Sequence, residues 1–373
     1  EKILPFSKMP ENYAHGSAQF FATAMPNRGS AIPLLVRSND GRPTKIEGNP
    51  EHPLSNGSTD QFAQASILNM YDPDRATRFA HKGVAATREA AIDFLSQAAK
   101  QFTVSQGDGL CFLMERSSSP SRTRLQALLA DKLPKARWFV YEPTDFDVHR
   151  QAASLVHSDP RSPQSPAGQL RLAPDNRIDQ AKVILSLDCD FLGTEEDSYL
   201  NIRRFANGRR LKEPTDSMNR LYAVEGLFSL TGANADHRLR IPTGQVLGIA
   251  ARIAVEVLAH SSVAREAAGV SAALKSLSEG VKVDAKWITE CAKDLLANKG
   301  KSLVLAGHRQ PLAVQVIAQA LNVALGNHGK TVILQGAEEA ASGNITDLAT
   351  VLNAGQVDTL VKDGPGALMV YAG

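Results

Sequence analysis

The chain has 373 residues, of which 43% are hydrophobic and 21% are charged, so it is long enough for two or three globular domains. Lys and Arg number 41 against 39 Asp and Glu, and a formal net charge of +2 indicates neither nucleic acid nor an anionic membrane as partner. No apolar run reaches the roughly 18 residues of a membrane-spanning helix. The best candidate, residues 248–260, is interrupted by Arg252 and Glu256.

The first predicted element is a β-hairpin. Residues 34–36 form a short apolar run, Asn39-Asp40-Gly41 is a turn signal, and residues 43–48 return as a second strand. Three dipeptides follow within 49–57, namely Asn-Pro, His-Pro and Asn-Gly, and they predict a stiff, irregular connection.

Helical and strand patterns alternate along the rest of the chain. Strands that alternate with helices favour a largely parallel, doubly wound sheet, so the predicted fold class is α/β. Residues 158–176 are rich in Pro, Ser, Gly and Arg and predict an exposed connection. Helices are predicted at 87–101, 119–129, 202–207, 244–258, 285–298 and 311–325, and strands at 110–114, 138–141, 181–187, 220–224, 302–306, 331–334 and 367–370.

The three cysteines, Cys111, Cys189 and Cys291, are far apart in the sequence and form no C-x-x-C pair. An iron–sulfur cubane normally needs four thiolates, so this chain should hold no cluster of its own. Each cysteine lies in or beside an apolar run, which is typical of a small buried hydrophobic residue. One disulfide stays open as an alternative if the protein is exported.

Residues 324–331, ALGNHGKT, fit a loose form of the phosphate-binding loop. Such a loop needs a strand before it and a helix after it, so that the amides at the helix N-terminus converge on the phosphates. Here the predicted helix precedes the motif and the strand follows it. We therefore predict a helix C-cap at Gly326-Asn327 and no ATP site. No G-x-G-x-x-G follows a predicted strand, which makes a dinucleotide-binding Rossmann enzyme a poor hypothesis.

Several stretches resemble the molybdopterin oxidoreductase superfamily. They are KIEGNPEHP at 45–53, NGS at 56–58, YDPDR at 71–75, and the longer segments 218–239 and 308–331. The resemblance is greatest to the B subunit of bacterial alternative complex III, a quinol-oxidising respiratory complex, whose members are also described as Tat-variant-translocated molybdopterin oxidoreductases.

Three departures from the superfamily pattern remove expected ligands. In the superfamily, a strand like 183–187 is followed by Gly-x-Asn, which contacts the pterin cofactor. This chain has Asp188-Cys189-Asp190 at that place, and its two acids would repel the anionic phosphate of the cofactor. Where the superfamily has Pro-Gly-Thr-Asp, residues 242–245 are Pro-Thr-Gly-Gln, without the acid for a guanine edge. Thr59 and Asp60 stand where a cluster cysteine would follow NGS.

The resemblance implies a division into four segments. A small β-rich N-terminal domain spans 1–75, and Rossmann-like α/β domains as in the formate dehydrogenase/DMSO reductase superfamily follow. The first part of one such domain is 76–175, an inserted domain is 176–280, and the return part is 281–373, truncated at the C-terminus. The chain starts at Glu1 without a signal peptide and ends just after an apolar strand pattern, so we expect a fragment of a longer protein.

The implied function is a cofactor-free scaffold portion of an iron–sulfur electron-transport subunit in a quinol oxidoreductase of the respiratory chain. Iron–sulfur clusters are expected in a downstream part, and an upstream Tat-type signal would place the protein at the periplasmic face of the inner membrane. Expected partners are c-type cytochrome and integral membrane subunits, and no nucleic acid. Two alternatives stay open: an active molybdopterin oxidoreductase subunit that binds a guanine dinucleotide cofactor, and a free-standing interaction protein of unrelated role.

No catalytic, cofactor-binding or metal-ligating residue is predicted in this portion of the oxidoreductase. His237, beside Asp236, is a candidate base or ligand, but a loop histidine next to an acid is more often solvated or hydrogen-bonded. Interfaces that fix cofactor distances use Arg and aromatic side chains at their centres. We expect such a surface to include the 49–57 connection and a loop formed by Asp236-His237-Arg238. Its proposed side chains are Arg42, Arg75, Tyr71 and Phe62. For Phe62 a position in the core is favoured.

Overall fold

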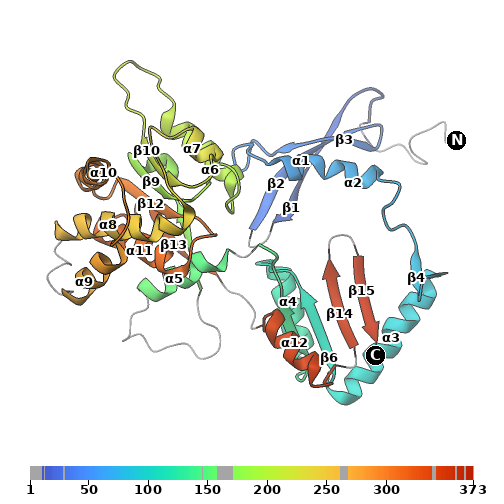
Figure 1. Cartoon of the computed structure of the whole chain (residues 1–373). Helices are drawn as coiled ribbons and strands as arrows, with labels where there is room; N and C mark the ends of the chain where they lie inside the picture. Colours follow the sequence, from blue (N-terminus) through green and yellow to red (C-terminus); the bar gives the residue numbers. More distant parts are fainter. Residues whose placement is uncertain are drawn as a thin grey trace. The chain divides into compact units, whose positions relative to one another are not determined.

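The structure is a computed structural model that describes residues 11, 13–27, 30–144, 146–157, 171–260, 268–337, 342–357, 359–364 and 367–372. The chain forms two compact units (Figure 1). Unit 1 contains residues 1–144, 166–168 and 338–373, and unit 2 contains residues 145–165 and 169–337. The division into four segments stays a prediction.

The N-terminal part of unit 1 is a three-stranded antiparallel sheet in the order β1-β2-β3. Asp40 and Gly41 have φ of 50° and 75°, and two positive-φ residues between strands are typical of the tight hairpin turn. The predicted hairpin is confirmed. The strands are β1 (Gln19–Asn27), β2 (Ser30–Asn39) and β3 (Arg42–Gly48).

The connection after β3 folds back on the end of that strand. The carbonyl oxygen of Asn49 accepts hydrogen bonds from the backbone N–H of both His52 and Gly57. A Cβ at position 48 would collide with the carbonyl oxygen of Gly57, so only glycine fits there. Two short helices follow, α1 (Gln61–Ala65) and α2 (Ile67–Tyr71), and then a small hairpin, β4 (Phe79–His81) and β5 (Val84–Ala86).

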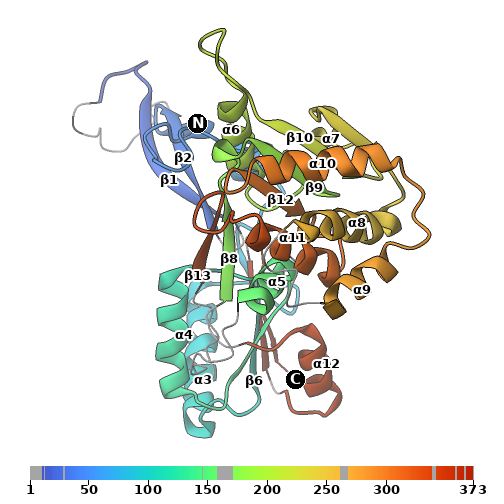
Figure 2. The same ribbon diagram turned by 90° about the vertical axis from the view of Figure 1, so that its left-hand side faces the viewer.

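The second sheet of unit 1 has the order β15-β14-β6-β7, in which β6, β7 and β14 are parallel and β15 is antiparallel to β14. Cys111, Phe139 and Leu348 form one buried cluster of this region, so α12 packs on the sheet (Figure 2). The elements are β6 (Leu110–Met114), β7 (Arg137–Val140), β14 (Thr359–Gly364), β15 (Ala367–Ala372), α3 (Arg88–Ser105), α4 (Pro120–Lys132) and α12 (Ile345–Asn353).

Unit 2 is built on a parallel sheet in the order β11-β10-β9-β12. Every residue of β9 is buried, as expected for an inner strand covered on both faces. The strands are β9 (Val183–Leu187), β10 (Arg220–Glu225), β11 (His237–Arg240) and β12 (Ser302–Ala306).

Alternate residues of β9 pack on opposite faces of the sheet. Val183, Leu185 and Leu187 contact the cluster formed with α8 (Val246–Ala259), α10 (Ala285–Ala297) and α11 (Leu312–Ala324). Ile184 belongs to a second cluster, which includes Phe205 of α6 (Ser198–Arg209). The mixed α/β class is confirmed, whereas the doubly wound, Rossmann-like arrangement predicted for the chain stays a prediction.

The predicted exposed connection at 158–176 is wrong over its last part. Residues 158–170 lie outside the described residues, and residues 171–176 form β8, which pairs antiparallel with β13. Pro174 and the polar composition hide this strand, and the distant partner β13 supplies its pairing. The remaining elements are β8 (Arg171–Asn176), β13 (Val332–Ala337), α5 (Asp147–His157), α7 (Leu230–Ala233), α9 (Ala268–Leu277) and the short 3-10 helices Ile178–Gln180 and Thr243–Gln245.

The phosphate-loop-like segment follows a helix and precedes a strand, as predicted. Helix α11 ends at Ala324, and Gly326 has a φ of 66°, the left-handed conformation of a glycine just past a helix end. Within the described ranges, no helix combines the length and the apolar character that crossing a bilayer requires.

Candidate functional site

The strand order of unit 2 reverses between β9 and β12. Strands β10 and β11 are added on one side of β9, and β12 lies on the other side. In open parallel sheets, ligands bind outside the carboxyl ends of the strands at such a reversal. The segments there are 188–190 and 307–310. Glu195 contacts His308, and His149 contacts Glu195 and the Ala306 carbonyl oxygen. We call the two segments together with Glu195 and His149 the switch-point site.

The two segments of the switch-point site touch through their backbones. The Gly307 N–H donates to the Leu187 carbonyl oxygen at 3.0 Å, and a Cβ at position 307 would collide with the carbonyl oxygen of Asp188. Asp188 itself has a φ of 52°, a left-handed conformation that favours glycine and that Asp tolerates better than most residues. The backbone therefore has, at Asp188, the conformation suited to the glycine of the superfamily's Gly-x-Asn.

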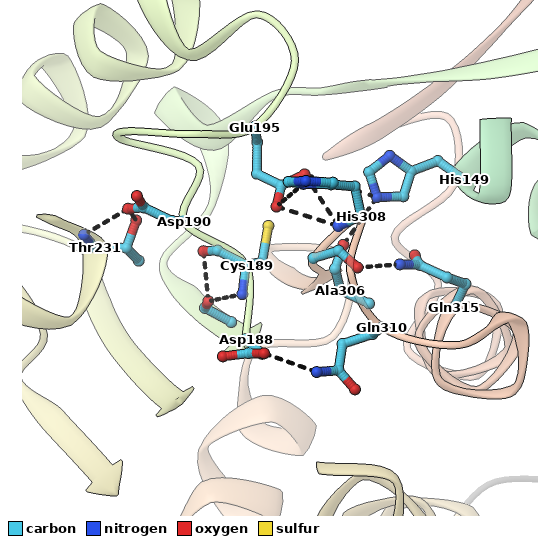
Figure 3. Close-up of polar contacts among 12 residues, drawn as sticks. His149, Asp188, Cys189, Asp190, Glu195, Thr231, Ala306, His308, Gln310 and Gln315 are labelled. Carbon is cyan, nitrogen blue, oxygen red and sulfur yellow. Dashed lines mark hydrogen bonds and ion pairs between the residues drawn. The ribbon is translucent and has the colours of Figure 1, made fainter. Parts of the chain in front are cut away.

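Both acids of the Asp188-Cys189-Asp190 tripeptide are bound by the chain's own donors (Figure 3). The Gln310 side-chain amide donates to Asp188 Oδ2 at 2.7 Å. Asp190 Oδ1 accepts from both the backbone N–H and the hydroxyl of Thr231, each at 3.0 Å. These contacts tie the carboxyl end of β9 to the segment after β12 and to α7.

A third carboxylate, Glu195, lies between two histidines (Figure 3). Its side chain is 6% exposed, and it contacts His308 Nδ1 at 2.9 Å and accepts from the His308 backbone N–H at 3.2 Å. His149 Nε2 lies 3.9 Å from Glu195 and 3.0 Å from the Ala306 carbonyl oxygen. Because a carbonyl only accepts, Nε2 of His149 carries a hydrogen. Burial lowers the pKa of His149, and the nearby Glu195 only partly opposes this effect. The lowered pKa favours the neutral ring.

Cys189 is buried beside these carboxylates, a setting that disfavours the reactive thiolate form. Burial raises its pKa well above the usual value, and the charges of Glu195, Asp190 and Asp188 add to the effect. Cys111 and Cys291 are also free and buried, with pKa values raised by burial, which confirms the predicted setting of all three cysteines. In the part of the chain that the structure describes, no three His, Cys, Asp or Glu side chains converge as metal ligands would.

The switch-point site does not fit the anionic dinucleotide cofactor that the superfamily resemblance implies. Its carboxylates would repel phosphate oxygens, and the Gln310, Thr231 and His308 donors already bind these carboxylates. At the carboxyl end of β11, Gln245 stands at the N-cap of α8 without a side-chain capping bond. These internal hydrogen bonds hold the loops at the carboxyl ends of β9 and β12 together.

Asp236 and His237 lie at the amino end of β11, whereas the switch-point site lies at the carboxyl ends of the strands. The loop predicted at 236–238 is wrong for His237 and Arg238. His237 and Arg238 belong to β11, because they pair with Tyr222 and Ala223 of β10. The His237 ring stacks on Tyr222 with centroids 4.6 Å apart. Asp236 forms an ion pair with Arg209 and accepts a hydrogen bond from the Leu221 N–H. Burial alone would raise the pKa of Asp236, but these two contacts outweigh burial and hold the pKa below its usual value.

The residues proposed for a partner surface are mostly exposed. The predicted core position of Phe62 is wrong, since its side chain is 70% exposed and the five-residue helix α1 buries only Ala63. The Tyr71 hydroxyl donates to the Pro43 carbonyl oxygen at 2.5 Å, and Arg75 donates to that of Met70. Arg42 is exposed at the start of β3. Their part in an interface stays a prediction.

Thr59 and Asp60 stand where the superfamily resemblance predicts a cluster cysteine. The Asp60 carboxylate accepts from the Ala63 N–H at 2.7 Å and caps α1. Sequence reasoning missed His149, Glu195, His308 and Gln310. The available signal was the position of His308 and Gln310 directly after a buried strand, where parallel sheets place functional side chains.

Comparison with known proteins gives one partial sequence match. No family model matches the chain. The chain is 37% identical over 73 residues, or 20% of its length, to the "Menaquinone reductase, molybdopterin-binding-like subunit" of Nitratidesulfovibrio vulgaris, and the match spans only 10% of that protein.

Among solved structures, the chain is similar to the formyltransferase/hydrolase complex (FhcABCD) from Methylorubrum extorquens in complex with methylofuran. The likeness covers 75% of this chain and 65% of the chain in that structure, at 14% identity and a TM-score of 0.42. That likeness is too slight to carry an argument. The sequence match supports a relationship to molybdopterin oxidoreductase-like proteins.

Proposed function

We propose that this chain is a cofactor-free, molybdopterin oxidoreductase-like scaffold within an iron–sulfur electron-transfer subunit of a quinol oxidoreductase of the alternative complex III type. The observation that carries this proposal is the closure of the switch-point site by Asp188, Glu195 and their internal donors. The name of the partial relative, a menaquinone reductase subunit called molybdopterin-binding-like, supports a quinone-linked oxidoreductase role.

The energetics of the switch-point site favour a scaffold. A ligand that displaced His308 would leave the buried Glu195 carboxylate with fewer hydrogen bonds, at a cost of about 1–3 kcal/mol, and displacement of Gln310 would cost less because Asp188 is only half-buried. The same bonds fasten the segments after β9 and β12 to each other. Electron transfer needs fixed distances between cofactors, and a stiff cofactor-free unit can hold neighbouring redox modules in register.

The partners follow from this role as further proposals. They are iron–sulfur modules of the same polypeptide, a c-type cytochrome subunit and integral membrane subunits. The assembly would lie at the periplasmic face of the inner membrane, after export by an upstream Tat-type signal.

The alternative function is that of an active subunit that binds a molybdopterin guanine dinucleotide. One observation favours it, which is the left-handed backbone of Asp188 at the position of the superfamily's glycine. The two functions differ in whether the chain binds a guanine nucleotide.

Titration with guanosine diphosphate separates the two functions, because this nucleotide carries the guanine and phosphate groups of the cofactor. Calorimetry on the purified chain should detect no saturable binding up to about 1 mM nucleotide, which corresponds to a binding free energy weaker than about −4 kcal/mol. Saturable one-to-one binding at micromolar concentration would favour the alternative. Adenosine diphosphate serves as the matched control for non-specific phosphate binding.

A further inference from the structure

Strand β1 is a long edge strand without charge. It lies on the outside of its sheet and, among the described strands, pairs with β2 alone (Figure 1). Its nine residues, QFFATAMPN, include no Asp, Glu, Lys or Arg. Phe20 and Phe21 point to opposite faces and are 55% and 54% exposed. Proteins normally blunt edge strands with charges or short length, so an edge of this kind is suited to pairing with another strand.

Two prolines indicate which backbone groups of β1 face the open edge. Pro33 of β2 lies opposite Ala24, and Pro26 is two residues further along β1. A pair that contains proline cannot exchange both N–H···O bonds, and bonded and non-bonded pairs alternate in an antiparallel ladder. Ala24 and Pro26 therefore belong to non-bonded pairs with β2, as do Ala22 and Phe20 by alternation. The backbone groups of these residues point away from β2.

We propose that a second copy of this chain adds its own β1 to this edge, antiparallel, with Ala22 of each copy on a two-fold axis. In this register Ala22 faces Ala22 of the partner subunit, and Phe20 faces Ala24 of the partner subunit. The outward N–H groups at positions 20, 22 and 24 then all meet outward carbonyl oxygens. Pro26, which has no N–H, lies beyond these paired positions.

The same register explains why the occupant is an identical strand. Identical strands without charge meet with no like-charge repulsion, and a two-fold contact requires this self-complementarity. Large side chains face small ones in this register. Phe20 lies opposite Ala24 of the partner subunit, and Phe21 lies opposite Thr23 of the partner subunit. A single strand pair is smaller than a permanent interface, so the dimer should dissociate on dilution to roughly micromolar concentration. This inference is independent of the function proposed above.

Sedimentation velocity of the 373-residue chain between about 1 and 100 µM tests the pairing. The wild type should show a monomer–dimer equilibrium. Ala22→Lys and Ala22→Glu should each raise the dimer Kd at least about fivefold, because identical charges then face each other across the axis. An equimolar mixture of the two variants should dimerise again. Val104→Lys, at an 88% exposed position of α3, is the control that should leave the equilibrium unchanged.

Circular dichroism melts establish that each variant is folded. A wild type that stays monomeric over the whole concentration range would overturn the proposal. So would a dimer that both Ala22 variants form as tightly as the wild type, because the contact would then lie elsewhere on the chain. A mixture that fails to pair would overturn the Ala22-centred register.

Discussion

Asp188 has a left-handed backbone conformation that would suit a glycine. Its carboxylate, which a glycine would lack, accepts a hydrogen bond from Gln310 at the end of β9. The position of the Asp188-Cys189-Asp190 tripeptide was predictable, because a strongly apolar strand precedes it. Its partners were not. His308 and Gln310 lie 113 and 122 positions away from the acids they bind, and one sequence contains no signal for such long-range pairs.

His149 should make the stability of unit 2 depend on pH. Its pKa in the folded protein lies below the usual 6.5, because the ring is buried, although Glu195 and Glu196 partly offset the effect and His308 adds to it. Below pH 6.5 the unfolded chain binds a proton that the folded ring resists, so the free energy of unfolding falls as pH falls, by at most about 1.4 kcal/mol per pH unit.

Thermal unfolding from pH 8 to about pH 5 measures this effect. The variant His149→Gln keeps an amide donor for the Ala306 carbonyl oxygen but cannot titrate, so its melting temperature should fall less steeply with decreasing pH than that of the wild type. Equal slopes for the two proteins would show that other groups control the acid response.

At the scale of elements, β12 is an edge strand whose backbone groups are bound by side chains. Asn322 of α11 accepts from the Val304 N–H at 3.0 Å and donates to the Val304 carbonyl oxygen at 2.8 Å. Thr331 donates its hydroxyl hydrogen to the Ser302 carbonyl oxygen at 2.6 Å. These side chains supply the bonds that a further strand would supply, and they limit the sheet to four strands.

Asn322→Leu should destabilise unit 2 by at least about 2 kcal/mol, because both backbone groups of Val304 lose buried partners. The matched control is Gln319→Leu on the same helix, where the amide oxygen is buried without a hydrogen-bond partner. That substitution should be neutral or stabilising. Denaturant unfolding followed by circular dichroism compares the two variants, and an equal loss in both would contradict the role given to Asn322.

The elements that the sequence predicted well have strong local signals. Helix α3 begins after Thr87, whose side chain accepts from the Ala90 N–H, and its apolar spacing is regular. The missed strands depend on distant partners: β8 pairs with β13, and β14 lies between β6 and β15. Strand formation depends on such neighbours more than on local propensity, so composition alone concealed these strands.

At the scale of the whole chain, the architecture is mixed α/β. The carboxylates of the switch-point site are hydrogen-bonded by the chain's own residues. Unit 2 has a parallel sheet with buried hydrophobic clusters on both faces. The partial sequence match is to a subunit described as molybdopterin-binding-like. We propose that this chain contributes rigidity to a redox complex and holds no cofactor of its own.

The molybdenum content of the purified chain tests this claim most directly. The chain should be produced in a host that makes the guanine dinucleotide form of the cofactor, with an active molybdopterin oxidoreductase prepared in parallel as the positive control. Elemental analysis should find molybdenum far below one atom per chain, whereas a specific tight site would be filled. About one molybdenum per chain, accompanied by an extractable pterin, would contradict the account.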